Sequence, residues 1–195
     1  MAILVVGSVA FDSLETPSGK RERVLGGAAT HFSLAASFFT QVRVVGVVGE
    51  DFTAEEERVM TDKGVDTRGL ERAPGKSFHW TGSYLKDLNE ADTLATDLNV
   101  FAAFEPKIPD AYKDSEYLFL ANIDPVLQLR VRQAMPNVKM VAGDTMNYWM
   151  TEAHRDNLLK VLPELDVLII NDKETRILSG EANGLKAAKK VLEMG

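Results

Sequence analysis

Short apolar runs alternate with longer amphipathic segments along most of the chain. Five of these runs are continuous and rich in Val, Ile and Leu, which is typical of strands buried on both faces of a sheet. They cover residues 3–6, 42–48, 117–121, 138–142 and 167–170. Helices are expected in the segments between and after them, so the alternation predicts parallel βαβ units. The sequence therefore predicts an α/β fold of three layers, with helices on both faces of one parallel sheet.

Helix boundaries are marked by polar residues that fit N-terminal caps. Asp51 is expected to cap the second helix, and Asp124 precedes Pro125, which suits the first helical position. Asn171 is followed three residues later by Glu174, the spacing of a capping box. The other helices are expected over residues 28–39, 151–162 and 185–194.

The middle of the chain has a different pattern. Residues 78–85 and 93–100 alternate between apolar and polar side chains, which predicts strands with one covered and one solvated face. The polar residues 87–92 between them predict a hairpin loop, so this part is expected to form a small antiparallel appendage. Residues 8–24 are interpreted as a loop with at most one edge strand. Trp80 and Tyr84 fit the core of the appendage or a seam between two subunits better than a stacking platform for a sugar ring.

Composition and charge restrict the classes of function. The net charge of −7 argues against nucleic acid as a partner, because phosphate binding needs clustered Lys and Arg. The chain has no cysteine, which excludes disulfides and thiolate chemistry. No run approaches the ~20 apolar residues of a membrane span, and the first residues lack the basic start of a signal peptide. A cytoplasmic protein without nucleic-acid or membrane partners is therefore expected.

The polar connections between strands and helices are expected at one edge of the sheet. Residues 7–12, 49–51, 122–124, 144–147 and 171–174 each follow a predicted strand, and the carboxyl ends of parallel strands are where ligands bind. Gly26 and Gly27 open a helix of small residues, which suits either close approach of a ligand to bare backbone or a tight turn. A P-loop and a G-x-G-x-x-G dinucleotide fingerprint are both absent from the sequence.

Four motifs in a fixed order give the chain a family resemblance. They are GSVAFD at 7–12, GGAATH at 26–31, VVGVVGEDF at 44–52 and INDKE at 170–174. In this order they resemble the PfkB carbohydrate kinases, also called ribokinase-like sugar and nucleoside kinases. The resemblance implies one incomplete ribokinase-like domain over residues 1–195, expected to be truncated at its C-terminus, whose β lid is formed by segments near 9–24 and 69–104. It also implies ATP and Mg²⁺ as cofactors, and phosphate transfer to a hydroxymethyl group of a sugar or nucleoside.

The resemblance also assigns roles to individual residues. Asp12 is expected to hold substrate hydroxyls, and Gly26 and Gly27 to line the same site. Asn171 and Glu174 match the family's N-x-x-E signature, which orders Mg²⁺ and the ATP phosphates, with Glu174 acting through water. Each residue also has a structural alternative: Asn171 with Glu174 suits a helix cap, and Asp12 suits a solvated loop.

Two further residues are candidates for substrate contact. His31 stands where the family usually has Asn, so it is expected to bear on substrate identity, although a structural histidine is the alternative. Asn99 is expected either to contact the sugar from the lid or to lie on its wet face. The lid of this family often pairs subunits, which leaves a homodimer through the lid as a further expectation.

The chain departs from the family pattern at other positions. Ala54 replaces a usual Gly, and Trp149 stands where Arg is common. No G-A-G-D sequence occurs, although this motif supplies the family's anion hole and catalytic base. The base is therefore expected beyond Gly195, and residues 1–195 alone are expected to be inactive. The alternative is a non-catalytic sugar-binding or regulatory module of the same fold.

Overall fold

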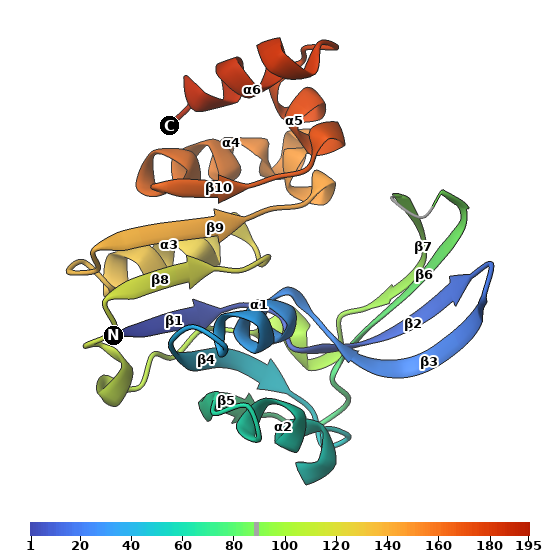
Figure 1. Ribbon diagram of the computed structural model, residues 1–195, viewed down its shortest axis with the longest axis vertical. Coiled ribbons are helices and arrows are strands. Elements are labelled where there is room, and N and C mark those ends of the chain that lie inside the picture. Colours follow the sequence, from blue (N-terminus) through green and yellow to red (C-terminus); the bar gives the residue numbers. More distant parts are fainter. Residues whose placement is uncertain (88–89) are drawn as a thin grey trace.

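The structure is a computed structural model that describes residues 1–87 and 90–195 (Figure 1). Its main sheet has six strands in the order β10-β9-β8-β1-β4-β5, and every neighbouring pair is parallel. The strands are β1 (Ala2–Val6), β4 (Gln41–Val48), β5 (Asp66–Arg72), β8 (Tyr117–Leu120), β9 (Met140–Asp144) and β10 (Val167–Ile169). The prediction of a parallel α/β sheet is confirmed.

Helices cover both faces of this sheet. They are α1 (Ala28–Ala36), α2 (Ala54–Thr61), α3 (Pro125–Ala134), α4 (Glu152–Val161), α5 (Asp172–Ser179) and α6 (Gly184–Leu192). Short 3₁₀ segments η1 (Asn99–Ala103), η2 (Asp110–Tyr112), η3 (Asn147–Met150) and η4 (Leu162–Glu164) lie between them. None of the described helices is long and apolar enough to cross a membrane.

Alternate side chains of β1 enter two separate apolar cores, one on each face of the sheet. Leu4 and Val6 belong to the core that α3 covers, whereas Val5 belongs to the core under α1 and α2. All three side chains are fully buried, and removal of such apolar surface from water is the main favourable term in folding. This packing fixes the carboxyl ends of the strands relative to one another.

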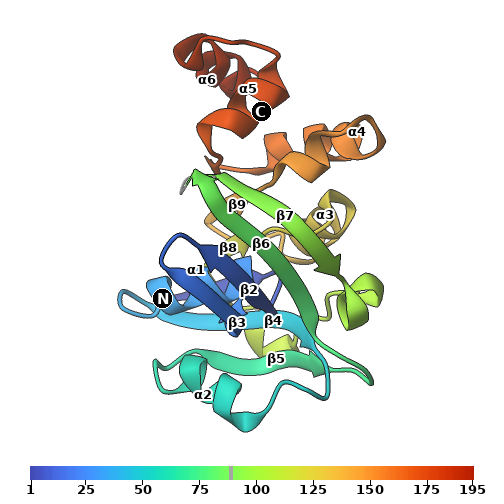
Figure 2. The same ribbon diagram turned by 90° about the vertical axis from the view of Figure 1, so that its right-hand side faces the viewer.

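A second sheet of four strands stands beyond the carboxyl ends of β1, β4 and β5 and forms a lid (Figures 1 and 2). Its order is β3-β2-β6-β7, built from β2 (Ala10–Thr16), β3 (Gly19–Gly26), β6 (Phe78–Asp87) and β7 (Glu90–Asp97). The predicted hairpin of β6 and β7 is antiparallel, but β2 and β6 pair in parallel. The lid is mixed because both strands enter it from the same edge of the main sheet.

Several predicted boundaries were wrong. Residues 8–24, expected as a loop with at most one edge strand, contribute to both β2 and β3, and β5 was not predicted. The first helix ends at Ala36, not at 39, and the alternation over 93–100 gives way at Asn99 to η1. Thr53, not Asp51, caps α2. In the loop predicted at 87–92, residues 88–89 lie outside the described part of the chain.

Candidate active site at the carboxyl ends of the strands

The order of the strands places a topological switch point between β1 and β8. From β1 the sheet extends to β4 and β5 on one side, and later to β8, β9 and β10 on the other. Ligands of open α/β sheets bind at such points, outside the carboxyl ends of the strands. The two chain segments are very close here, because a Cβ on Gly7 would lie 2.4 Å from the Cβ of Ala121.

Asp12 of the lid lies directly against the glycine pair that opens α1. A Cβ on Gly26 would lie 2.0 Å from Oδ2 of Asp12, and the backbone N–H of Gly27 donates a hydrogen bond to the carboxylate. Gly27 has φ 93°, and a Cβ on it would lie 2.4 Å from the carbonyl oxygen of Ser8. Only glycine fits both positions, so the pair is what lets Asp12 reach the start of the helix.

The environment of Asp12 disfavours its charge. Burial raises the pKa of this carboxyl above its usual range, although the positive potential of His31 and His79 and the Gly27 N–H oppose the shift. His31 is exposed on α1, one helical turn from the glycines. The structure thus brings together four of the predicted substrate-side residues: Asp12, Gly26, Gly27 and His31.

On the other side of the switch point, Asn171 and Glu174 meet at the start of α5. Oδ1 of Asn171 accepts a hydrogen bond of 2.8 Å from the Glu174 amide, and Oε2 of Glu174 accepts one of 3.4 Å from the Asn171 amide. The predicted capping box is therefore present. Burial raises the pKa of Glu174, against hydrogen bonds from Asn171 and from the backbone of Asn147.

Asp144, at the end of β9, completes this group of oxygens. Burial, together with the negative charge of Glu174, raises the pKa of Asp144 to about 7. Its Oδ1 is buried and accepts no hydrogen bond from any residue in the described part of the chain. Sequence reasoning placed Asp144 at this edge but gave it no role of its own, since its proximity to Glu174 depends on how β9 and α5 pack.

Comparison with known proteins shows the family to which the chain belongs. The family model for the pfkB family carbohydrate kinases matches residues 2–195. The chain belongs to this family. Cytidine kinase from Thermococcus kodakarensis is 25% identical to it over 193 residues, which cover 97% of this chain and 68% of that protein.

Solved structures of other kinases share the fold of this pfkB-family chain. The apo form of a putative ribokinase II from E. coli has a TM-score of 0.80 and 15% identity, over 99% of this chain and 70% of that one. A nucleoside kinase from Burkholderia thailandensis, solved in complex with inosine, has a TM-score of 0.76 and 16% identity, over 96% and 67%. The predicted ribokinase-like fold and family are confirmed.

The oxygen donors of the pfkB-family chain suit Mg²⁺. An unpartnered buried carboxylate oxygen beside a second carboxylate is stabilised by a cation, and Mg²⁺ prefers oxygen ligands. Within residues 1–87 and 90–195, no three His, Asp or Glu side chains gather as a metal cluster. Mg²⁺ takes about six oxygen ligands, so water and phosphate oxygens would have to complete its shell beside these two carboxylates.

Asn99 has a different neighbourhood from the other predicted site residues. Its Nδ2 donates a hydrogen bond of 2.9 Å to the carbonyl oxygen of Ser77. It lines a cavity of about 410 Å³ together with Arg23, Asp51 and His79, among others. The structure gives its side chain a contact at the base of the lid, and a role in substrate binding stays a prediction.

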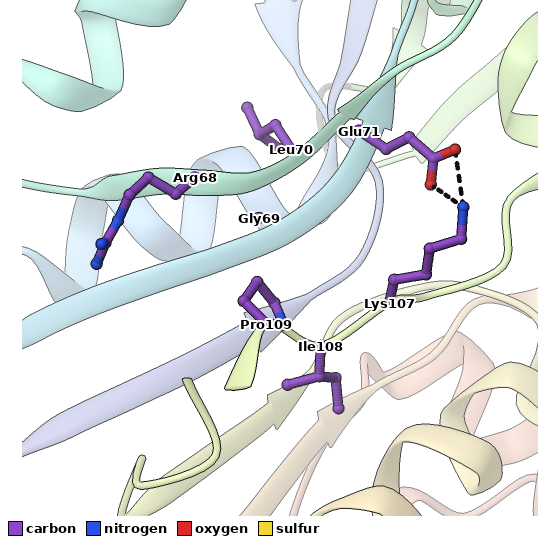
Figure 3. A pocket seen from close by; sticks show the side chains of 7 residues that line it. All are labelled: Arg68, Gly69, Leu70, Glu71, Lys107, Ile108 and Pro109. Carbon is purple, nitrogen blue, oxygen red and sulfur yellow. Dashed lines mark hydrogen bonds and ion pairs between the residues drawn. The ribbon is translucent and has the colours of Figure 1, made fainter. Parts of the chain in front are cut away.

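A further hollow of about 400 Å³ lies at the outer edge of the sheet, beside β5 (Figure 3). Glu71 and Lys107 point toward each other across one end of it, with Nζ of Lys107 3.0 Å from a carboxylate oxygen of Glu71. This hollow is at the opposite edge of the sheet from β9 and β10, so it is not part of the group around Asp144 and Glu174.

Proposed function

We propose that this pfkB-family chain serves ATP- and Mg²⁺-dependent transfer of a phosphoryl group to a hydroxymethyl group of a sugar or nucleoside. One observation carries the proposal: the switch point has a half-buried carboxylate, Asp12, on one side and the Asp144–Glu174 acid pair on the other. Phosphoryl transfer asks a protein mainly to position two substrates and to stabilise charge. The two groups of residues divide these tasks.

On the acceptor side, Asp12 binds two hydroxyl groups of the substrate. An ionised carboxylate accepts from both hydroxyls, and charge-assisted hydrogen bonds are stronger than neutral ones. Burial raises the pKa of Asp12, so the empty site disfavours its charged form. Hydrogen bonds from the substrate hydroxyls favour that charged form, and ionisation of Asp12 therefore favours binding. Gly26 and Gly27 leave the backbone bare beside the carboxylate, and His31 borders the same site.

On the phosphate side, Asn171 and Glu174 order the nucleotide phosphates, with Glu174 and Asp144 holding Mg²⁺ through water. When bound, the ion would neutralise negative charge on the transferred phosphoryl group. The Asn171–Glu174 capping box keeps both side chains at the start of α5, where free N–H groups and the helix dipole favour anions. No residue of this chain is assigned the role of the base.

The names of similar proteins support this choice of substrates. One relative is a cytidine kinase, and one structural neighbour was solved in complex with ATP and Mg²⁺. A second candidate function is sugar binding without phosphate transfer, which needs only the acceptor side around Asp12, Gly26 and Gly27.

Calorimetry and an ADP-release assay test the proposal together. The chain is expected to bind Mg·ATP and at least one member of a panel of sugars and nucleosides, and Asp12→Ala is expected to abolish acceptor binding only. Glu174→Gln should weaken binding of Mg·ATP and leave acceptor binding intact. Acceptor binding without any binding of Mg·ATP would favour the non-catalytic candidate, and absence of both would overturn the proposal.

A further inference from the structure

Asp12 and Trp80 lie side by side on one face of the lid. In the parallel pairing of β2 with β6, Asp12 is the register partner of Trp80. Partners at one register position point to the same side of a sheet, and neighbouring strands are about 4.8 Å apart. Since the Asp12 carboxylate contacts Gly26 and Gly27, this face of the lid is turned toward the start of α1 and the carboxyl ends of the strands.

Gly82 lets the Trp80 indole lie flat along β6. A Cβ on Gly82 would lie 2.0 Å from Cη2 and 2.5 Å from Cζ2 of the ring, so any other residue would lift the indole off the strand. Nε1 of Trp80 donates a hydrogen bond of 3.3 Å to Oγ1 of Thr93 on β7. The glycine below and the threonine beside it thus fix the plane of the ring.

Part of the indole is open to solvent, because Trp80 is only half-buried. The rings of Trp80 and Tyr84 form a T-shaped pair, with centroids 6.5 Å apart and an interplanar angle of 74°. A flat aromatic surface is therefore presented next to the carboxylate that the proposed function assigns to substrate hydroxyls.

We infer that Trp80 is a stacking platform for a planar heterocycle of the acceptor, which makes the acceptor a nucleoside. This inference rests on the proposed function. A nucleoside has vicinal ribose hydroxyls next to a flat base, and Asp12 and Trp80 present a carboxylate and a flat ring on adjacent strands. A simple sugar would engage Asp12 and leave the indole uncovered. Because every base has a π-face, stacking selects the class of acceptor and not one base.

Four variants separate stacking from a structural role of Trp80. Trp80→Ala removes the ring and Trp80→Phe keeps a smaller flat ring. Gly82→Ala keeps the indole but forces it away from the strand. Thr81→Val is the matched control, since it lies on the same strand with its side chain on the opposite face. All four are tested as the 195-residue chain, with thermal unfolding to establish that each is folded.

Calorimetric titrations with cytidine, adenosine and ribose give the decisive comparison. The original chain is expected to bind both nucleosides more tightly than ribose. Trp80→Ala should weaken nucleoside binding roughly 5- to 150-fold, the range for loss of one base–aromatic stack, and leave ribose binding unchanged. Trp80→Phe should recover most of the affinity, Gly82→Ala should lose it, and Thr81→Val should match the original chain.

Fluorescence gives a direct readout of contact. The chain has two tryptophans, so Trp149→Phe leaves Trp80 as the only indole. Cytidine is expected to quench and shift its emission, and ribose at saturating concentration is expected not to.

The outcomes distinguish failure of this inference from failure of the proposed function. Equal binding of ribose and nucleosides, or an equal loss of both in Trp80→Ala, would overturn the inference and leave the kinase proposal standing. Absence of binding by ribose and by both nucleosides would overturn both. A shift in oligomeric state on Trp80→Ala, with nucleoside affinity unchanged, would assign Trp80 to a subunit seam.

Discussion

Arg23 of the lid and Asp51 of the main body form a two-point contact across the base of the lid. The guanidinium donates to Oδ2 of Asp51 at 3.0 Å and to its carbonyl oxygen at 2.5 Å, while it lies 3.8 Å from the centroid of the Phe11 ring. Oδ1 of Asp51 accepts from both the amide and the hydroxyl of Ser77, each at 2.7 Å. One carboxylate therefore ties β3 and the start of β6 to the loop after β4.

Arg23→Ala and Asp51→Ala are expected to show coupled effects on stability. Asp51→Ala leaves two donors of Ser77 and Nη1 of Arg23 without their carboxylate acceptor, although Nη2 keeps the backbone carbonyl, so it should lower the free energy of unfolding by about 1–3 kcal/mol. Arg23 is about half exposed, and its loss should cost about 1 kcal/mol. The double variant should destabilise the chain by less than the sum, because both substitutions break one network. Urea unfolding of the four chains measures this, and strictly additive effects would contradict the contact.

The charge of Asp51 should make this contribution depend on pH. Burial opposes ionisation of Asp51, but the hydrogen bonds from Ser77 and Arg23 outweigh it and lower the pKa of the carboxyl. A lowered pKa stabilises the folded chain above the pKa of the unfolded state, near 3.9, and this stability is lost as the pH falls below it. The difference in stability between the original chain and Asp51→Asn should therefore be present at pH 7 and shrink at pH 3.5. A difference that does not change with pH would argue against an ionised Asp51 in the contact.

Substitutions at Asp12 are expected to separate function from stability. Because burial raises the pKa of Asp12, its ionised form disfavours the folded state at pH 7, and Asp12→Asn should leave stability unchanged or raise it. Acceptor affinity should nevertheless fall at least 10-fold, since a neutral amide replaces charge-assisted hydrogen bonds. Calorimetry with the preferred acceptor and urea unfolding check both parts.

Gly26→Ala should reach the same loss of affinity by a steric route. The new Cβ would lie 2.0 Å from Oδ2 of Asp12, so the carboxylate has to move although its charge is kept. Gly184→Ala is the matched control, because a Cβ there makes only an ordinary contact 3.5 Å from the Arg176 side chain. Full acceptor affinity in Gly26→Ala would show that the position of Asp12 against α1 does not matter for binding.

Local sequence patterns predicted the buried strands of the fold but not the strands at the edges of its sheets. Buried runs such as residues 42–48 are continuously apolar, so their sequence alone identifies them. β3 and β5 are edge strands of their sheets and mix charged with apolar residues, as exposed edges do. The mixture of charged and apolar residues leaves no regular alternation in either strand, even though β3 pairs with its neighbour β2.

The sequence predicted those candidate residues that lie within a recognised motif. These are Asp12, the glycine pair and the Asn171–Glu174 cap, and the structure brings Asp12, Gly26 and Gly27 together. Asp144 was given no role of its own, and for Trp80 a stacking role was the least favoured of three. Their neighbours are set by strand pairing and helix packing over long separations. The parallel pairing of β2 with β6, for example, joins segments 68 residues apart at Asp12 and Trp80.

Thr53, not the predicted Asp51, should account for the stability of the α2 start. Its side chain accepts a hydrogen bond of 3.2 Å from the Glu55 amide, and its own amide donates one of 2.7 Å to Glu56. Thr53→Ala should lower the free energy of unfolding by about 1 kcal/mol, the usual effect of losing such a cap. Thr53→Ser is the control and should restore most of the loss in urea unfolding. An equal loss in both variants would assign the effect to the threonine methyl group.

Asp144 should make the stability of the chain decrease as the pH rises from 5 to 8. Its pKa of about 7 exceeds the unfolded value near 3.9, so the folded chain keeps a proton that the unfolded chain has released. Stability from this proton is therefore lost as the pH rises through 7, by about 2–3 kcal/mol over this interval. Asp144→Asn should remove that dependence, whereas Asp156→Asn on the exposed face of α4 should retain it.

Magnesium should reduce the loss of folding stability that follows ionisation of Asp144 at high pH. A bound cation stabilises the charged carboxylates, whereas burial alone disfavours them. Urea unfolding at pH 5 and pH 8, with and without MgCl₂ and ATP, measures both effects on the same three chains. The original chain is expected to gain more from Mg·ATP at pH 8 than Asp144→Asn does. If the two chains gain equally and keep the same dependence on pH, Asp144 neither titrates in this range nor serves the ion.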